Sequence, residues 1–349
     1  MLLDLAAGCA GDRLLPCREA AMTAPGATVA VSVVVPTYKR PDLLARCLEA
    51  LCRQRLSVPY EILVCDDAAS EATHRQVADY SARWGDAPAV RYLPVSGTRG
   101  PSGARNLGWR SAKAEIIAFT DDDTIPHPDW LAQGLRGFAP DVAAVTGVTE
   151  MPIPDPPSDY ERDASGLTRA EFITANCFVR RSALLAVGGF DTRYTMAWRE
   201  DSDLQFALLD AGLRIARCEH ARVQHPVRPV SFGAGLGMQK KVMFDMLLRR
   251  KYPALYQERI RRHGPRFYLS VTGAFLLAAG LFTTGHAAAA IAPAVVWAAL
   301  TLYFFMRRIR GTSMSLRNVA DLAITSACIP LLSIFWRTVG LLRFARSAA

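Results

Sequence analysis

The sequence predicts an α/β fold with a mainly parallel central sheet, followed by transmembrane helices at its C-terminal end. Two observations predict it. In the first two thirds of the chain, short apolar or β-branched runs alternate with segments of helical periodicity, the pattern of parallel strands joined by helices. The stretch from Phe267 to Met306 then contains no Asp, Glu, Lys or Arg, which suits two membrane spans of about 20 residues each.

The first half of the expected sheet starts with the β-branched run Val31–Pro36, which a proline closes as in a buried strand. A helix is expected from Pro41 to Gln54, since proline suits the first turn and apolar residues recur at helical spacing. Further strands are expected at 61–65, 90–94 and 116–119, with a helix at 71–84 and a loop leading into a helix at 96–113.

Beyond residue 150 the pattern is less regular. The segment 151–165 is rich in proline and acidic residues and indicates a loop or insertion. We expect a strand at 171–179, a turn at 188–191, an amphipathic helix at 202–211 before Gly212, and an extended segment at 223–225. A basic, helical linker starts at about Gly233.

The formal net charge of +9 gathers around the uncharged stretch. Arginines precede it at 249–266 and follow it at 307–310, whereas the expected turn at 283–286 has none. The positive-inside rule places both flanks in the cytoplasm, and the basic flanks suit an anionic lipid surface. A buried hairpin in a soluble core is the alternative, although uncharged helices of this length are rare there. No nucleic-acid-binding motif accompanies the basic charge.

Three other segments receive limited interpretations. The apolar stretch from Leu322 to Trp336 suits either a third transmembrane helix or a helix lying in the membrane interface. The eight cysteines have no zinc-site spacing and are expected to be reduced, buried thiols. The first 28 residues do not resemble a signal peptide, so we expect a flexible leader there, with Met22 as an alternative start.

Acidic residues follow two of the expected strands. Asp121, Asp122 and Asp123 follow the run 116–119, and Asp66-Asp67 ends the run 61–65. Adjacent unpaired carboxylates repel one another unless a cation compensates them, and open α/β sheets bind ligands at the carboxyl ends of their strands. The triplet therefore indicates a divalent-metal site of the kind that also holds a diphosphate. The spacing excludes an EF-hand, and the loop 96–103 lacks the signature of a P-loop.

Several motifs, taken in order, resemble family 2 glycosyltransferases, which have a GT-A fold. The resemblance covers roughly residues 29–226. It is carried by the segments 33–40 (VVVPTYKR), 65–67 (CDD), 103–108 (GARNLG), 119–131 (FTDDDTIPHPDWL), 188–191 (GGFD) and 200–204 (EDSDL). It implies that the nucleotide-binding residues are Pro36, Thr37, Tyr38, Asp66, Asp67, Arg105 and Asp122, with one or both of the Asp66-Asp67 pair on the base or ribose.

The resemblance also implies the residues that handle the reaction. Asp121 and Asp123 would form a DxD motif that holds Mg²⁺ or Mn²⁺, and His225 would be a further metal or diphosphate contact, with a purely structural histidine as the alternative. Asp201 would be the catalytic base. Glu200 and Trp198 would lie on the acceptor side. Capping of the helix at 202–211 is the alternative explanation for the acidic group Glu200-Asp201.

These inferences predict five segments and one activity. The segments are a leader (1–28), a GT-A glycosyltransferase domain (29–232), a basic helical linker (233–266), a transmembrane hairpin (267–306), and a basic loop with a third membrane or interfacial helix (307–349). The activity is inverting, metal-dependent transfer from a nucleotide-diphosphate sugar to a hydroxyl of a lipid-linked or glycan acceptor, at the cytoplasmic face of the cell inner membrane. The absence of a Gln-x-x-Arg-Trp motif after residue 204 favours transfer of one or a few sugars over polymer synthesis.

Two alternative functions stay open. A nucleotidyltransferase could use a similar nucleotide-binding sheet, but the glycine- and lysine-rich signature of that class is absent. A non-catalytic, membrane-anchored sensor of sugar nucleotides would not need an intact acidic set, and this chain has one.

Overall fold

A mixed eight-stranded sheet forms the centre of the computed structural model, which describes residues 28–260 and 265–345. The expected leader lies outside these residues except for Thr28. The strand order is β3-β2-β1-β4-β7-β6-β8-β5. The strands are β1 (Val31–Thr37), β2 (Tyr60–Asp66), β3 (Ala89–Pro94), β4 (Ile116–Phe119), β5 (Ile125–Pro126), β6 (Val142–Glu150), β7 (Cys177–Arg180) and β8 (Arg214–Gln224).

The parallel part of the sheet is confirmed. Strands β3, β2, β1 and β4 are parallel neighbours, and β6 is parallel to β8. The short strand β7 is antiparallel to both β4 and β6 and joins the two parallel groups. Strands β1 and β4 are parallel neighbours, so both end at the same edge of the sheet. The turn that carries Asp121 therefore lies beside the loop that follows Thr37.

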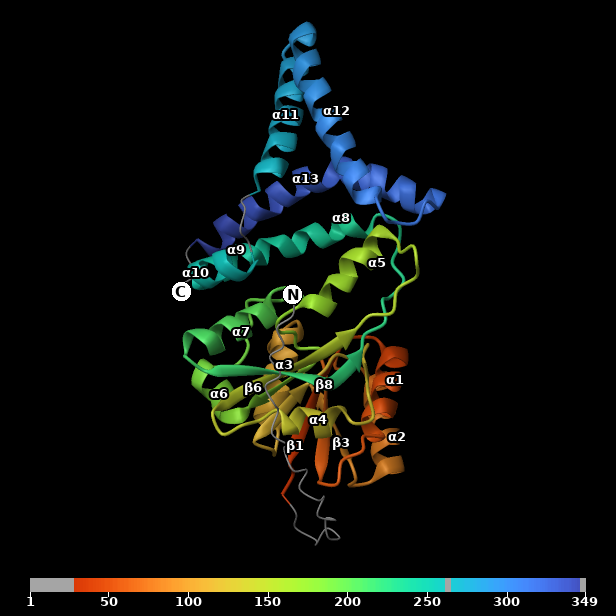
Figure 1. The fold of residues 1–349 in the computed structure, drawn as a ribbon, viewed down its shortest axis with the longest axis vertical. Coiled ribbons are helices and arrows are strands. Elements are labelled where there is room, and N and C mark those ends of the chain that lie inside the picture. The colour runs from red at the N-terminus through yellow and green to blue at the C-terminus, as the bar shows by residue number, and fades with distance from the viewer. Residues whose placement is uncertain (1–27, 261–264, 346–349) are drawn as a thin grey trace, which may run out of the picture.

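Helices cover both faces of the sheet (Figure 1). Val33 and Val35 of β1 pack on one face with α1, whereas Val34 packs on the other face with α3, as the alternation of a strand requires. The helices that precede the C-terminal helical part are α1 (Pro41–Cys52), α2 (Glu71–Trp84), α3 (Pro101–Ser111), α4 (Trp130–Arg136), α5 (Asp159–Ala164), α6 (Arg181–Val187) and α7 (Glu200–Asp210).

Three sequence-based boundaries need correction. The strand expected at 171–179 is only β7, because its partner β4 has four residues and the segment before Cys177 turns instead, with the Asn176 N–H donating to the Ile173 carbonyl. The extended segment at 223–225 is the end of the much longer β8. The proline-rich segment 151–165 contains the helix α5, which a capping box of Ser158 and Glu161 begins.

The C-terminal part is helical and forms a separate layer (Figure 1). The linker contains α8 (Ala234–Met238), the 3-10 helix η2 (Gln239–Val242), α9 (Met243–Lys251), α10 (Pro253–Leu255) and the π-helical turn η3 (Tyr256–Ile260). It is followed by α11 (Arg266–Thr283), α12 (Ala287–Ile309) and α13 (Leu316–Phe344). By length and composition, these last three helices could each cross a membrane.

The three long helices do not run in the same direction. In Figure 1, α11 and α12 form a hairpin that projects away from the sheet, with its tip at the turn expected near Gly285. Helix α13 lies across the base of this hairpin and packs against α11 and α12 on one side and against α8 and α9 on the other. This arrangement favours the interfacial alternative for the third apolar stretch.

Candidate active site

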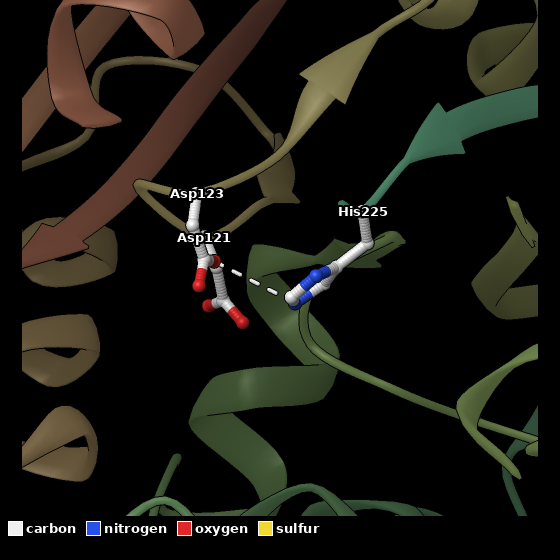
Figure 2. Close-up of side chains that lie close together, drawn as sticks. All are labelled: Asp121, Asp123 and His225. Atoms are coloured by element: carbon white, nitrogen blue, oxygen red, sulfur yellow. Dashed lines mark ion pairs between the residues drawn. The ribbon is translucent and has the colours of Figure 1, made fainter. Parts of the chain in front are cut away.

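Three predicted metal ligands come together at the carboxyl end of β4 (Figure 2). Ligand atoms of Asp121, Asp123 and His225 all lie within 4.8 Å of one another. His225 follows β8, and its backbone N–H donates to the Glu150 carbonyl at 2.8 Å. The sequence separates His225 from the aspartates by about a hundred residues, and the pairing of β8 with β5 and β6 brings them together.

The residues present fit a divalent cation. Carboxylate oxygens suit Mg²⁺ or Mn²⁺, and an added imidazole nitrogen suits a transition-metal ion better than Mg²⁺. The Nε2 atom of His225 lies 3.5 Å from Asp123 Oδ1, and its Nδ1 atom is buried without a hydrogen-bond partner. A buried ring nitrogen left in this way is costly unless a ligand occupies it. Asp123 also pairs with Arg228, whose Nε atom is 3.0 Å from Oδ2.

The turn that carries the aspartates is fixed from inside the protein. The Thr124 hydroxyl donates to the Asp121 carbonyl at 2.7 Å, and the Thr124 N–H reaches the same carbonyl at 3.2 Å. The Thr120 hydroxyl donates to the Ala175 carbonyl on the neighbouring β7 side. Because the buried threonines fix the backbone, the Asp121 and Asp123 side chains are held toward His225.

Asp122 points away from the metal ligands. Its Oδ2 atom accepts a hydrogen bond from the Thr37 hydroxyl at 2.8 Å, and its Oδ1 atom lies 3.2 Å from Arg40. Burial raises the pKa of Asp122 to about 6, with the neighbouring aspartates adding to the rise and Arg40 opposing it. Asp122 therefore connects the triplet to the loop after β1, where Tyr38 is half-exposed.

The two acids after β2 differ in what they offer a ligand. Asp66 is fully buried, and its carboxylate accepts from the backbone N–H groups of Ala68 and Ser70, the Ser70 hydroxyl and the Tyr92 hydroxyl. Asp67 accepts from the Gly100 N–H through Oδ2, while its Oδ1 atom is buried without a partner. Asp66 thus shapes the turn, and Asp67 presents an oxygen that a nucleotide could use.

Arg105 connects the metal group to the second acidic motif. It is buried on α3, with Nη2 2.7 Å from Asp121 Oδ1 and Nη1 3.2 Å from Glu200 Oε1. Burial raises the pKa of Glu200, and so does its neighbour Asp201, whereas Arg105 lowers it. Burial raises the pKa of the Asp201 carboxyl as well. The acidic residues at the start of α7 therefore lie near the candidate metal ligands, which helix capping alone does not explain.

The turn before α7 has a constrained backbone. Arg199 has a φ of 72°, in the left-handed region, and the helix starts directly after it. Asp201 Oδ1 accepts the N–H of Ser202 at 2.7 Å. Trp198, expected on the acceptor side, is 39% exposed and stacks against the Arg199 guanidinium. The exposed indole and the Asp201 carboxylate thus lie on one short segment.

Sequence reasoning missed the basic residues that surround this site. Arg40 and Arg228 pair with Asp122 and Asp123, and Lys241 of η2 lies near enough to Glu200, Arg228 and Arg40 for their charges to shift its pKa, which burial lowers. Arg228 could have been suspected from the sequence, because it lies only three residues after the predicted ligand His225. Lys241 carried none, because the segment that holds it looks like an ordinary basic linker.

Comparisons with known proteins agree with the fold and the motifs. Residues 32–196 match the family model described as Glycosyl transferase family 2. Residues 32–196 thus form a domain of this family, and the chain is a glycosyltransferase. The comparisons thus support the transfer of a sugar from a nucleotide-sugar donor.

Two curated relatives and one solved structure show the range of similarity. Glycosyltransferase AglE of Haloferax volcanii is 27% identical over 242 residues, which cover 64% of this chain and 78% of AglE. Validoxylamine A glucosyltransferase of Streptomyces hygroscopicus is 36% identical over 121 residues, or 33% of this chain and 28% of that enzyme. The mannosyltransferase PcManGT of Pyrobaculum calidifontis, solved with GDP-Man and Mn²⁺, has a TM-score of 0.55 and 22% identity, covering 86% of this chain and 88% of its own. Its likeness supports the GT-A-like fold.

Proposed function

We propose that the chain transfers a sugar, with inversion, from a nucleotide-diphosphate sugar to an acceptor hydroxyl, and that it uses Mg²⁺ or Mn²⁺. The observation that carries this proposal is the convergence of Asp121, Asp123 and His225, whose ligand atoms lie within 4.8 Å of one another. When bound, the cation neutralises charge on the departing nucleoside diphosphate. The Mn²⁺ in the PcManGT structure supports this assignment.

The donor would bind across the carboxyl ends of β1, β2 and β4. Asp67 Oδ1, which has no internal partner, would accept a hydrogen bond from the base or ribose. Asp122 accepts a hydrogen bond from Thr37 and so lies beside the loop that follows β1. Arg40, Arg228 and Lys241 bring positive charge to the edge of the acidic group, as a diphosphate requires.

Asp201 would act as the general base on the acceptor side. A carboxylate whose pKa is raised by burial is a stronger base than a solvated one. It would take the proton of the acceptor hydroxyl while the oxygen forms its bond to the anomeric carbon and the bond to the diphosphate breaks. One displacement of this kind inverts the anomeric centre and needs no covalent intermediate. Glu200 would lie beside it, held by Arg105.

The acceptor is proposed to be lipid-linked or a membrane-associated glycan. The α11–α12 hairpin would span the inner membrane with its arginine-rich base in the cytoplasm, and α13 would lie in the interface. The catalytic domain would then face the cytoplasm and take its nucleotide-sugar donor from there. Trp198, exposed beside Asp201, would contact the acceptor sugar. The match to a family of sugar transferases disfavours the two alternatives, a nucleotidyltransferase and a non-catalytic sensor.

The full chain in nanodiscs provides the test. A panel of nucleotide sugars is screened for nucleoside-diphosphate release with Mn²⁺, with Mg²⁺ and after EDTA. We expect one or two donors to turn over, activity to vanish with EDTA and to return with added metal. Undiminished turnover in EDTA would remove the metal role, and release of pyrophosphate instead of a nucleoside diphosphate would favour a nucleotidyltransferase. NMR of the product determines whether the anomeric configuration is inverted.

A further inference from the structure

We propose that Asp245 of α9 is a positioning residue for the turn that carries Asp201 and that it connects this turn to α13. The proposal rests on the assignment of Asp201 as the base. Asp245 is buried, 4% exposed. Its Oδ1 atom accepts hydrogen bonds from Arg199 Nε at 2.8 Å and from Trp198 Nε1 at 3.1 Å. These two residues directly precede Glu200 and Asp201 in the chain.

The conformation of Arg199 explains why the turn needs an anchor. A left-handed backbone at a residue other than glycine costs of the order of 1 kcal/mol or more and persists only where the surroundings hold it. Arg199 is the residue directly before α7, and Asp201 lies in the first turn of this helix. The backbone conformation of Arg199 therefore sets the direction in which the Asp201 side chain points. The charged hydrogen bond from Arg199 to Asp245 holds this side chain, together with the stacking of the guanidinium on Trp198.

The same carboxylate reaches α13. Arg337 Nη2 lies 3.4 Å from Asp245 Oδ2, and the Nε and Nη1 atoms of Arg337 are buried without partners. Asp245 is therefore the counter-ion that compensates Arg337 among the described residues. One buried carboxylate thus faces two arginines, one before the catalytic turn and one on the helix that lies across the base of the membrane hairpin.

Apolar packing around Asp245 makes the connection rigid. A single hydrophobic cluster joins the segment before the turn, α9 and α13, and consists of Tyr194, Met196, Met243, Phe244, Leu247, Trp336 and Phe344. Helix α13 approaches α9 closely at Gly340, where a Cβ atom would lie 2.5 Å from the Met243 carbonyl oxygen. A shift of α13 would therefore move α9, and through Asp245 it would move the turn that holds Asp201.

The test compares Asp245→Asn with Asp321→Asn in the full chain in nanodiscs. Asp321 also ties α13 to the rest of the protein, since it accepts from the Gly233 N–H at 2.6 Å, but it does not contact the catalytic turn. We expect Asp245→Asn to lower kcat about 100-fold, as a displacement of about 1 Å in a catalytic group does. We expect the Kd for the nucleoside diphosphate to stay within about twofold, and Asp321→Asn to keep kcat near that of the parent protein.

Arg337→Gln is the second variant, because it leaves the Asp245–Arg199 pair in place and is the milder change. It is expected to lower kcat about tenfold with an unchanged Kd for the nucleotide. Equal kcat in the Asp245→Asn and Asp321→Asn variants would overturn the proposal, and so would a loss of nucleotide binding in step with kcat. Asp201→Asn is measured alongside, to distinguish failure of the base assignment from failure of the positioning role. If Asp201→Asn stays active, the assignment of Asp201 as the base fails. If Asp201→Asn is inactive and Asp245→Asn has a normal kcat, only the positioning role of Asp245 is rejected.

Discussion

Arg105 Nη2 lies 2.7 Å from Asp121 Oδ1, and this partly buried ion pair is where the two halves of the site meet. The other side of the same guanidinium faces Glu200. A proposed metal ligand and Glu200, the neighbour of the proposed base, thus share one cation, although they come from segments about eighty residues apart. The arrangement keeps Asp201 beside the position where the donor diphosphate would lie.

Replacement of Arg105 should be costly for the fold. Arg105→Gln leaves Asp121 and Glu200 close together without their common counter-ion, and breaking a buried pair in this way costs about 3–5 kcal/mol. We expect a markedly lower melting temperature. Arg91→Gln is the matched control, because Arg91 pairs with the buried Glu61 but is itself partly exposed, and Glu61 keeps Ser32 and the Lys113 N–H as donors. Equal melting temperatures for the two variants would contradict the central position of Arg105.

Replacement of Asp66 should lower stability, whereas replacement of Asp67 should weaken nucleotide binding. Asp66→Asn removes the charge that four internal donors surround, so we expect a loss of stability with donor affinity preserved in the folded fraction. Asp67→Asn should preserve the melting temperature and weaken nucleotide binding by about 1.5–3 kcal/mol, or roughly tenfold to a hundredfold in Kd. Calorimetric titration with nucleoside diphosphates measures the affinity, and the reverse pattern would refute the assignment of Asp67.

His225 should contribute to metal affinity. His225→Ala removes one of three ligands, so we expect the Mn²⁺ affinity, measured by electron paramagnetic resonance, to fall at least about tenfold. The control is His220→Ala, since His220 is an exposed residue of β8. A structural histidine, the alternative drawn from the sequence, would leave Mn²⁺ affinity unchanged and lower the melting temperature instead.

The Asp191 carboxylate should make the stability of the protein depend on pH in the acidic range. Burial alone would raise its pKa, but Arg193 and Lys251 outweigh burial and lower the pKa to about 2. A depressed pKa stabilises the fold above the ordinary value near 3.8, and this contribution is lost as the pH falls toward 2. Asp191→Asn should therefore cost about 2 kcal/mol at pH 7.

The pH profile checks this assignment. In chemical denaturation between pH 7 and 3, the stability difference between Asp191→Asn and the parent protein should stay constant down to about pH 4 and shrink below it. Asp141→Asn, on the surface pair with Arg214, should cost little at any pH. A difference that does not shrink in acid would show that Asp191 stabilises the protein by another route.

Much of the fold and part of the site could be predicted from the sequence. Strands β1, β2 and β4 are short and apolar, so their composition reveals them in the sequence, and the Asp121–Asp123 motif comes just after β4. Strand β8 was largely missed because its sequence is rich in charged residues, which are tolerated because only the two residues of β5 pair with its outer side. The direction of α13 is set by packing on α9, which hydropathy does not encode.

The remaining features depend on contacts between distant residues. Asp66 and Asp67 are adjacent and look equivalent in the sequence, and only the partners of each carboxylate distinguish them. Asp245 lies in an ordinary basic linker, 46 residues from Arg199 and 92 from Arg337, and no motif marks it. Arg105 was expected near the nucleotide, but its pairing with both acidic groups could be seen only in the structure.

The central claim is that Asp201 acts on the acceptor while Asp121, Asp123 and His225 hold the donor. The most direct test is Asp201→Asn, assayed for sugar transfer and for binding of the donor nucleotide with Mn²⁺ in the same preparation. We predict that transfer falls about 10²–10⁴-fold while the nucleotide and Mn²⁺ affinities stay within about twofold of the parent protein. Transfer at the parent rate, or loss of donor binding together with transfer, would contradict the claim.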